Sequence, residues 1–459
     1  MSTTNTLAGP SIPAPVAPGR LPLIGHGVQL ARRPLDFMNE LRELGTVVRI
    51  QLGPAPAYVV TDPELTRTIL VTEPKSFIKG GQIIEALRVF FGDGLATIAE
   101  GDLHRRNRRL MQPMFNRAHI AARGDAMIEL VERHTNAWAE GEPRAIHSEM
   151  NDLTLAAFLV ALFGTDLPTQ LEDGFTKLLP EIMRGTIRQT VLPGWLAAIP
   201  LPAQRAYRTN LVRLRELVDE TIQRERAKPD DENPGLFRTL LQARDPETGE
   251  SLSHEQLRDE VITLLTGSVE TTGTTLAWAL YEIARNPEVE AKLHEEIDRV
   301  CQDGHPRIQH MSELIYTRSV LQETMRCYGP AWLVTRRTTD EVVLGGYRIP
   351  RDVDVVYSPY ILQHDPAVYP EPDRFDPDRW VPGATPEIPR SSFLAFGDGA
   401  RKCIGESFAW TELMIILAVI AGRWRLSTAS EHAVKPVAHV TVHPDKLDMV
   451  PRRRAGRHQ

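Results

Sequence analysis

Apolar residues recur every three to four positions over much of the chain, which is the spacing of helices with one buried face. The pattern predicts helices over 118–139, 148–163, 203–227, 254–285, 287–302 and 311–328. An almost wholly apolar run over 413–422 predicts a last helix over 403–422. Because this run falls short of the roughly 18 residues that a membrane span needs, we interpret it as a core helix.

Two other regions show strand patterns of apolar and β-branched residues bounded by turn signals. In the first, strands are expected over 47–52 and 57–61, with Gly53 and Pro54 as the turn and a short helix over 34–44 ahead of them. In the second, strands are expected over 341–349 and 352–357. An irregular, proline-rich stretch follows over 364–402, and so long a loop inside a compact domain is usually functional. The predicted fold class is mainly α with small β-sheets.

The composition is that of a globular protein able to bury a large core, with 42% hydrophobic and 25% charged residues. Residues 1–21 are rich in proline, serine and alanine and predict a flexible leader. Because no linker follows, we expect one catalytic domain over 22–459. The net charge of −7 gives no reason to expect nucleic acid or an anionic membrane as a partner.

The three cysteines, Cys301, Cys327 and Cys403, are too few for a disulfide framework and fit a reducing compartment. The N-terminus has neither the layout of a signal peptide nor an anchor helix. We therefore expect a cytoplasmic protein without a membrane span, and we expect it to be a monomer.

The most informative segment is FGDGARKCIG over 396–405. Its glycines permit backbone conformations closed to other residues and a close approach to a flat ligand. Cys403 precedes the last predicted helix and has Arg401 and Lys402 beside it, a setting that favours the thiolate. Thiolate is the ligand that pushes electron density onto haem iron and favours O–O cleavage. An ordinary buried cysteine, the alternative, leaves the glycines and the arginine unexplained.

This segment resembles the haem-binding loop of the cytochrome P450 family, F-G-x-G-x-R-x-C-x-G, at every fixed position. The resemblance implies haem b with Cys403 as the iron ligand, and with Phe396 and Arg401 in contact with the cofactor. Weaker motifs of the family follow in the expected order, among them PGRLPLIGH near the N-terminus and QHDP over 363–366. The resemblance covers residues 18–450.

A Glu-x-x-Arg pair lies in the helix predicted over 311–328. At this spacing Glu323 and Arg326 share one helix face and can pair, although solvated helices often carry the same pattern. In the family, an arginine from a P-E-R-F segment completes such a pair, and PEPDRFDPDRW over 370–380 resembles that segment. The resemblance implies a structural brace of Glu323, Arg326 and Arg374, with Asp373 where the family has glutamate.

Basic residues in GDLHRRNRRLMQPMF over 101–115 are candidates for binding the haem propionates. His104 and Arg108 lie four residues apart on one helix face, where the family carries Trp-x-x-x-Arg and many bacterial members have histidine. Arginine suits this role because its planar fork matches a carboxylate. Arg336 and Arg401 are implied as two further propionate partners.

The helix predicted over 254–285 contains LLTGSVETTGTT in its apolar middle. A carboxylate and two hydroxyl groups there are costly without a purpose, and we expect Gly267 and the threonines to loosen the helix. The segment resembles the family's oxygen-activation motif, Ala/Gly-Gly-x-Asp/Glu-Thr-Thr/Ser, with Ser268 in place of the second glycine. The resemblance implies that Glu270 and Thr271 deliver protons to dioxygen through ordered water and that Gly267 forms the oxygen groove. A threonine that merely bends the helix is the alternative.

The resemblance implies a cytochrome P450 fold that holds haem between the 254–285 helix and the Cys403 loop. It implies insertion of one oxygen atom from O2 into an organic substrate, with electrons from NAD(P)H. With neither anchor nor fused reductase in the sequence, we expect a separate ferredoxin and ferredoxin reductase. The remaining arginines of the basic stretch, Arg105, Arg106 and Arg109, predict either a solvated face or a docking surface for an acidic redox partner.

The substrate pocket is expected from positions that the family turns toward haem: residues 80–91, Val269 beside the acid and alcohol pair, Ala331, Trp332, Leu333 and Val334. These positions are mostly apolar, which favours a hydrophobic substrate such as a terpene or a polyketide. The segments GDGLATIAEGDLHRRNRRLMQPMF, LGGYRIP, YSPY and HDP resemble those of bacterial members that oxidise terpenes in natural-product pathways.

Two other functions compete with this interpretation. A peroxide-dependent fatty-acid hydroxylase of the same family would replace the acid and alcohol pair, so Glu270 and Thr271 argue against it. A non-catalytic haem-thiolate sensor or electron carrier would need neither the pair nor a large apolar pocket. A substrate-induced change in the Soret spectrum would separate an enzyme from a sensor.

Overall fold

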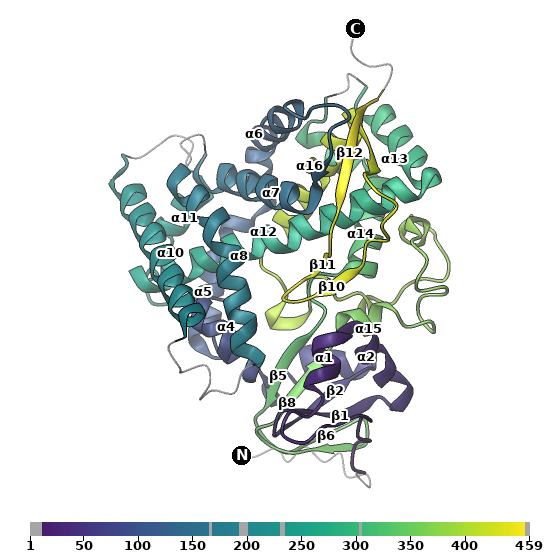
Figure 1. Cartoon of the computed structure of the whole chain (residues 1–459). Coiled ribbons are helices and arrows are strands. Elements are labelled where there is room, and N and C mark those ends of the chain that lie inside the picture. Colours follow the sequence, from purple (N-terminus) through teal and green to yellow (C-terminus); the bar gives the residue numbers. More distant parts are fainter. Residues whose placement is uncertain (1–11, 165–167, 192–200, 230–234, 303–304, 455–459) are drawn as a thin grey trace. The chain divides into compact units, whose positions relative to one another are not determined.

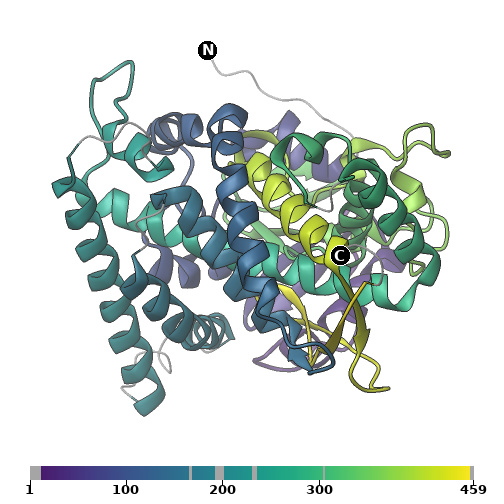
Figure 2. The same ribbon diagram turned by 90° about the horizontal axis from the view of Figure 1, so that it is seen from above.

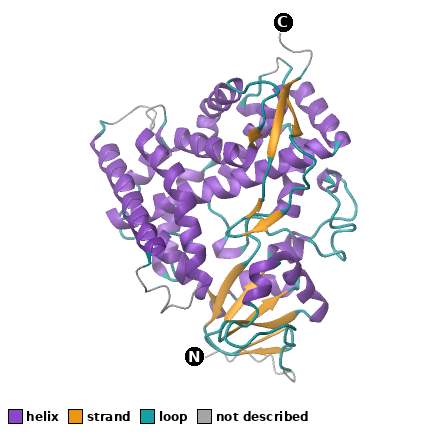
Figure 3. Ribbon diagram, viewed as in Figure 1, coloured by secondary structure: helices purple, strands orange, loops and turns teal. Residues whose placement is uncertain are grey.

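The computed structural model describes residues 12–164, 168–191, 201–229, 235–302 and 305–454. Its internal contacts divide the chain into two compact units, each assembled from separate segments. Unit 1 comprises Met1–Leu87, Ala331–Asp373 and Ile388–Cys403, and unit 2 comprises Arg88–Pro330, Arg374–Glu387 and Ile404–Gln459. Helices dominate the described chain and the strands form small sheets (Figure 3), which confirms the predicted fold class.

Unit 1 is built around a five-stranded sheet in the order β1-β2-β8-β5-β3. The strands are β1 (Val47–Leu52), β2 (Ala55–Val60), β3 (Phe77–Ile78), β5 (Val334–Thr338) and β8 (Asp354–Tyr357). All pairings are antiparallel except that of β2 with β8, and Val47 lies opposite Val60 in the first hairpin. A separate hairpin joins β6 (Val342–Leu344) to β7 (Tyr347–Ile349).

Side chains of β1, β2 and β8 alternate between two apolar clusters, so both faces of this part of the sheet are buried. Val47 packs in one cluster with Leu70 and Tyr357, and its neighbour Val48 packs in the other with Phe37. Burial on both faces explains why the strands read as nearly continuous apolar runs. The helical elements of unit 1 are α1 (Gly27–Arg32), α2 (Pro34–Leu41), η1 (Arg42–Leu44), α3 (Pro63–Arg67), η2 (Thr68–Thr72), η3 (Pro74–Ser76), α15 (Pro359–Gln363), η7 (Arg390–Ser392) and η8 (Gly399–Arg401).

Residues 12–21, the described part of the expected leader, follow the edge of unit 1. Ile12 bridges to Tyr347, and the amide of Ala17 donates to the carbonyl of Arg49 at 3.0 Å. The side chain of Ala17 is buried. From Ile12 onward, this segment is therefore tied to two strands; residues 1–11 lie outside the described residues.

Unit 2 contains the long helices (Figures 1 and 2). They are α5 (Asp102–Met111), α6 (Arg117–Asn136), α7 (Ile146–Phe163), α8 (Thr169–Val191), α10 (Pro202–Ala227), α11 (Leu236–Gln242), α12 (His254–Arg285), α13 (Pro287–Val300), α14 (Ile315–Tyr328) and α16 (Glu406–Arg423). The shorter elements are η4 (Gln112–Phe115), η5 (Ile308–Ser312) and η6 (Pro377–Trp380), while α4 (Gln82–Phe91) crosses from unit 1 into unit 2.

The centre of unit 2 is α12, which packs against α7, α14 and α16. It begins at a capping box in which Ser253 and Gln256 satisfy each other's backbone amides. Residues 272–283 of this helix are all buried. Gly273 permits the close contact with α7, since a Cβ atom there would lie 2.1 Å from Oδ1 of Asn151.

The helix α7 is long and apolar enough to cross a membrane by length and composition, and no other described helix meets that test. Its side chains are nevertheless mostly buried within unit 2, where α7 contacts α6, α11 and α12. We therefore interpret α7 as a core helix.

The strands of unit 2 follow its last helix, apart from one short partner. β9 (Trp424–Thr428) pairs with β12 (Asp448–Arg453), which also pairs with β4 (Arg144–Ala145). β10 (Pro436–Ala438) and β11 (Val442–Pro444) form a hairpin, and β11 contacts α12 (Figure 1). This hairpin reaches the acidic residue of α12, as described below.

Several sequence predictions need correction. The single strand expected over 341–349 is the hairpin β6–β7, because Gly345 and Gly346 both adopt positive φ and turn the chain. The helix expected from 311 begins at Ile315, after a 3-10 turn. The last helix begins at Glu406 rather than 403, because Cys403 still belongs to the preceding loop.

Candidate active site

The Cys403 loop is held in shape by its own backbone. The amide of Cys403 donates to the carbonyl of Phe396 at 2.8 Å, and the amide of Lys402 donates to that of Gly399 at 3.1 Å. Gly397 and Gly399 both have φ near +68°, with values of 68° and 67°. Only glycine adopts this conformation readily, so the glycine spacing of the segment is a requirement of the turn.

Gly399 has a second reason to be glycine. A Cβ atom at this position would lie 2.1 Å from the carbonyl oxygen of Leu70 in η2. The loop therefore packs directly on the backbone of another part of unit 1, and this contact fixes the loop that precedes Cys403.

Cys403 itself is exposed, whereas Cys301 and Cys327 are buried. Its thiol is therefore accessible to a ligand, as an iron ligand must be. Phe396 and Arg401 are half-buried in the same loop, and Arg336 is buried on β5 with its guanidinium 5.7 Å from the ring centre of Tyr357. One accessible sulfur with aromatic and guanidinium groups in the same unit is a donor set that fits a thiolate-ligated haem.

Unit 2 contains the other candidate cofactor residues. His104 and Arg108 lie one turn apart on α5, as their spacing predicted; His104 is buried and Arg108 half-buried. Both residues thus occupy the less exposed face of a strongly basic helix.

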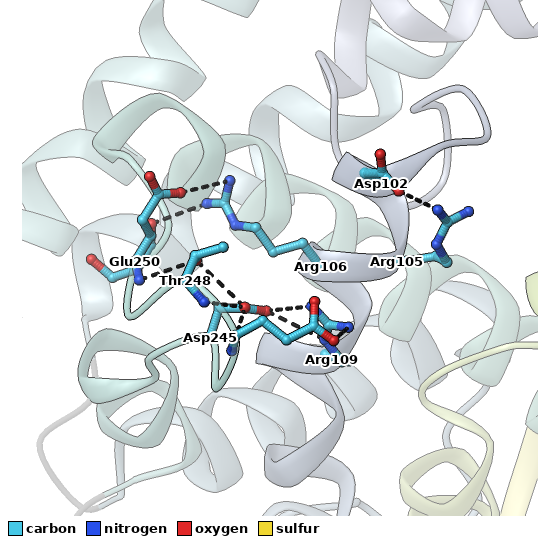
Figure 4. A network of polar contacts seen from close by, with 9 residues as sticks. Asp102, Arg105, Arg106, Arg109, Asp245, Thr248 and Glu250 are labelled. Atoms are coloured by element: carbon cyan, nitrogen blue, oxygen red, sulfur yellow. Dashed lines mark hydrogen bonds and ion pairs between the residues drawn. The ribbon is translucent and has the colours of Figure 1, made fainter.

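The other arginines of α5 have acidic partners within unit 2 (Figure 4). Arg109 binds Asp245 at 2.8 Å and Glu247 at 2.7 Å, and Arg106 lies 3.6 Å from Glu250. Arg105 pairs with Asp102 of its own helix. These contacts join α5 to the loop over 243–253.

Asp245 binds both its own loop and Arg109. Its Oδ1 accepts the amides of Glu247 and Thr248 at 3.0 Å each, while its Oδ2 faces Arg109. The hydrogen bond from Arg109 holds the pKa of Asp245 below its usual range. The sequence predicted that these arginines form either a solvated face or a docking surface. The first hypothesis is wrong for Arg106 and Arg109, because both side chains bind acidic residues.

In the middle of α12, one stripe of residues is less buried than the residues on either side of it. Leu264, Ser268 and Thr271 are half-buried and Gly267 is exposed, at the i, i+3, i+4 and i+7 spacing of a single helix face. A Cβ atom at Gly267 would meet nothing within 4 Å. This open stripe is where the sequence predicted a groove beside Gly267.

The helix is continuous through this stripe, so the expected unwinding at Gly267 is wrong. Thr271 donates to the carbonyl of Gly267 at 2.6 Å, and Ser268 donates to that of Leu265 at 3.0 Å. These back-bonds were predicted, but the helix absorbs them without leaving the α conformation. Ser268, the departure from the family motif, thus donates its hydroxyl hydrogen to its own helix, as Thr271 does.

Glu270 lies next to the open stripe and contacts the β10–β11 hairpin. Its Oε2 accepts a hydrogen bond of 3.4 Å from the Thr441 hydroxyl. Burial raises the pKa of Glu270, and the neighbouring His443 and Thr441 partly oppose that rise. A carboxyl group in such surroundings can hold a proton closer to neutral pH than an exposed one can.

The predicted pair of Glu323 and Arg326 is formed in the interior of unit 2. Arg326 Nε donates to Glu323 Oε2 at 2.8 Å and Nη2 donates to Oε1 at 2.9 Å, and both side chains are fully buried. Glu323 also accepts the amide of Asp376 at 2.9 Å and the indole of Trp380 at 2.8 Å. The buried charges therefore join α14 to the segment that contains η6.

The third predicted member of the brace, Arg374, lies beside the pair. Arg326 Nη2 donates to the carbonyl of Arg374 at 3.2 Å. The guanidinium of Arg379 also lies beside Glu323, with its Nε 3.4 Å from Oε1. Sequence reasoning missed Arg379 and Trp380, although both lie in the segment that it had identified.

The pocket candidates divide between the units. In unit 1, Ala331 is exposed and Trp332, Leu333 and Val334 are half-buried against the sheet clusters. In unit 2, Val269 is buried on a face of α12 away from the open stripe, because it lies about 100° further around the helix than Ser268. Leu264, which sequence reasoning missed, lies on the stripe itself.

Two further acids of α12 hold the loop over 92–97. Asp259 Oδ2 accepts the amide of Asp93 and Glu260 Oε2 accepts that of Leu95, each at 2.9 Å. Asn107 of α5 donates to the other oxygen of Glu260 at 3.5 Å. Burial raises the pKa of Glu260 to about 8. Carboxyl groups of α12 therefore hold the loop over 92–97, which precedes α5, through its backbone amides.

Comparison with known proteins gives one consistent result. The family model described as cytochrome P450 matches residues 15–450. Cyclooctatin synthase of Streptomyces melanosporofaciens is 40% identical over 95% of each chain. Pentalenene oxygenase of Streptomyces avermitilis is 38% identical over 95% of this chain and 96% of the relative.

Solved structures agree with these sequence matches. The heme domain of cytochrome P450DA is similar with a TM-score of 0.85 and 26% identity, over 97% of this chain and 98% of that one. The similarity to cytochrome P450 proteins thus covers nearly the whole chain, including the Cys403 loop and the Glu323–Arg326 pair.

Proposed function

This chain belongs to the cytochrome P450 family of haem monooxygenases, and we propose that it inserts one oxygen atom from O2 into a terpene. The observation that carries the haem-dependent part is the exposed thiol of Cys403 at the end of a loop fixed by Gly399. The relatives named above support the substrate class, since pentalenene is a terpene hydrocarbon.

Haem b is the proposed cofactor, and its bound iron supplies the activation of O2 that no side chain can perform. In unit 1, Cys403 is the proposed iron ligand, Phe396 contacts the ring, and Arg336 and Arg401 bind propionates. In unit 2, His104 and Arg108 are the proposed propionate partners. The buried position of His104 supports this role.

Glu270 and Thr271 are the proposed proton-supplying pair. Thr271 lies on the open stripe, while the carboxyl group of Glu270 is largely buried, with a raised pKa. A carboxyl group with a raised pKa can act as general acid, and the Thr271 hydroxyl, whose hydrogen is bonded to the Gly267 carbonyl, can accept a hydrogen bond from the water that carries the proton.

The substrate is proposed to contact apolar residues. Leu264 on the open stripe and Ala331, Trp332, Leu333 and Val334 in unit 1 provide such surface. Val269 is a weaker candidate than its position in the family motif suggests, because it is buried on another face of α12. A hydrocarbon gains affinity from such surface without needing a charged anchor.

Electrons are proposed to come from NAD(P)H through ferredoxin and ferredoxin reductase. Because Arg106 and Arg109 already have acidic partners, we do not assign partner docking to them. The enzyme is proposed to be a monomer in the cytoplasm, where these redox partners would reach it.

Spectral titration tests the substrate class. Purified holoenzyme is titrated with terpene hydrocarbons, with fatty acids and macrolides as comparison ligands. We expect terpenes to displace water from the haem and shift the Soret band, because they match the apolar surface. The proposal is then tested by product analysis with O2, NAD(P)H, ferredoxin and its reductase. A shift with macrolides or fatty acids alone would contradict the terpene assignment.

We predict that Thr271→Ala retains haem but diverts electrons to hydrogen peroxide. The change removes a hydroxyl from the proton path, so product per NADPH should fall at least about tenfold, below the roughly 100-fold or more that a general acid or base usually contributes. The ratio of product to NADPH consumed measures the effect.

Thr275→Ala provides the matched control. Thr275 makes the same back-bond, to the carbonyl of Thr271 at 2.8 Å, but its side chain is buried one turn away. Its coupling should stay close to that of the wild type. Equal uncoupling in both variants would show that helix distortion, and not the hydroxyl, is responsible.

A further inference from the structure

The β10–β11 hairpin of unit 2 brings two imidazoles together beside its turn. His443 lies opposite Val437 in the ladder, and the amide of His439 donates to the carbonyl of Thr441 at 3.0 Å. Opposite residues, and residues two apart along a strand, share one face of a hairpin, so the two histidines lie on the same face. Nε2 of His443 is 3.2 Å from Nδ1 of His439. Two nitrogens that can bind a metal ion therefore converge on one point.

The ring of His443 is oriented by the backbone of its own strand. Its Nδ1 lies 3.0 Å from the carbonyl oxygen of Pro444. A carbonyl only accepts, so Nδ1 carries the ring hydrogen, and Nε2 of the neutral ring directs a lone pair at His439. Metal-binding histidines are usually held in this way, with the second nitrogen donating to a carbonyl or carboxylate. The ligand nitrogen of His443 is thus in place before an ion binds.

A third imidazole fixes the plane of this ring. His147 of α7 stacks on His443 with ring centres 5.3 Å apart and an angle of 6° between the planes. Because the lone pairs of an imidazole lie in its own plane, two parallel stacked rings do not direct them at one ion. Nε2 of His147 contacts the hydroxyl of Thr274 at 3.2 Å instead. His147 therefore orients His443 without adding a ligand.

The separation of the two nitrogens fits a shared metal ion. Bonds of about 2.0–2.1 Å from zinc to imidazole place two nitrogens about 2.9 Å apart at a right angle and about 3.3 Å apart at the tetrahedral angle. The distance of 3.2 Å between His439 and His443 lies in this range. Without an ion, one hydrogen on Nδ1 of His439 joins the two rings. Binding requires only that this hydrogen move to Nε2 of the exposed His439 ring.

The other coordination positions belong to water. Within the described part of the chain, no group of three or more histidine, cysteine, aspartate or glutamate side chains could hold a metal ion. A two-histidine site therefore differs from a closed structural zinc site, which has four protein ligands, and its ion can exchange. Imidazole suits Zn2+, Ni2+ and Cu2+, whereas Mg2+ and Ca2+ prefer oxygen ligands.

We propose that His439 and His443 form a bidentate site for an exchangeable divalent transition-metal ion of the class of Zn2+, Ni2+ and Cu2+. Thr441, between the two histidines in the chain, donates to Glu270 at 3.4 Å. An ion at this site joins the two strands on either side of that contact. The site stands on the geometry of the hairpin alone and does not depend on the proton-supplying role proposed for Glu270.

Isothermal titration calorimetry of the holoenzyme with ZnCl2, NiCl2 or CuCl2 tests the site without substrate. We expect one site per chain, tightest for Cu2+, and no binding of Mg2+. His439→Gln and His443→Gln should each weaken binding at least about tenfold, since loss of a partner outside the ligand set alone costs about 10–100-fold. The reduced CO spectrum checks that each variant is folded holoenzyme. Absence of binding, or equal affinity in both variants and the wild type, would overturn the proposal.

Two further variants serve as matched controls. His432→Gln removes an exposed histidine of the same region, whose Nε2 lies 3.1 Å from Asp445, and should bind the ion as the wild type does. An equal loss in this variant would refute the assignment, because it would reflect surface histidines in general. His147→Phe keeps a stacked ring without nitrogen and should also retain the ion. Loss of binding there would make His147 a ligand and contradict the two-histidine site.

Anomalous scattering locates the ion directly. In crystals of the holoenzyme soaked in ZnCl2, data collected at the zinc absorption edge should show a peak about 2.0–2.1 Å from Nδ1 of His439 and from Nε2 of His443. A zinc peak elsewhere, with none between these two nitrogens, would overturn the proposal even if calorimetry detects binding.

Discussion

Replacing Cys403 with alanine is expected to abolish the red-shifted Soret band of the reduced CO complex. That band requires thiolate ligation, and the accessible thiol of this loop is the proposed ligand. Monooxygenase activity should fall to background with it, because electron donation by the thiolate favours O–O cleavage. The CO difference spectrum and product formation with a ferredoxin system measure the two effects.

Cys301→Ala is the natural control for this change. Cys301 is fully buried after α13, so its replacement removes a sulfur from the core without touching the loop. It should cost some stability but leave the band in place. A thiolate spectrum that survives Cys403→Ala would disprove the assigned ligand.

The second large effect is expected from Glu323→Ala. This change leaves the guanidinium of Arg326, with no exposed side-chain surface, as an uncompensated buried charge. It also removes the acceptor of Trp380 and of the Asp376 amide. Breaking such a buried pair destabilises a protein by about 3–5 kcal/mol. Urea unfolding followed by tryptophan fluorescence measures the loss.

An exposed pair with the same spacing shows whether burial is the cause. Arg213 and Glu216 of α10 are also three residues apart, 3.2 Å from each other, but their side chains are 52% and 54% exposed. Glu216→Ala should change the free energy of unfolding by less than about 1 kcal/mol. Similar losses in the two variants would refute the claim that the Glu323 site is a structural brace.

The sequence predicted long helices well where their ends carry chemical signals. α12 was expected over 254–285 and has those bounds, because Ser253 caps its first turn and Asn286-Pro287 ends it. The helix α8 was missed, although its apolar residues have helical spacing, since Gly174 and Pro180 weaken the propensity signal. Tertiary packing against α10 compensates for both.

The site was less predictable, and sequence distance is the reason. The Cys403 loop and the Glu323–Arg326 pair are local patterns, so the chain itself displays them. Thr441 and Glu270 are 171 positions apart, and no period or propensity connects them. The acidic partners of Arg109 lie 136 and 138 positions further along the chain, which is why its pairing was not foreseen.

The buried carboxyl of Glu260 has a consequence for how this protein responds to alkali. Its pKa is about 8 in the folded chain and near 4.5 when exposed, so between these values the folded state keeps a proton that the unfolded state releases. The free energy of unfolding therefore declines as pH rises through this window and stops declining above it. Because Glu260 holds the loop over 92–97 through the Leu95 amide, its ionisation acts at the entrance to α5. Glu260 lies on α12, the helix that bears the proposed proton donor. Its ionisation therefore sets an upper limit on the pH range in which the folded protein is most stable.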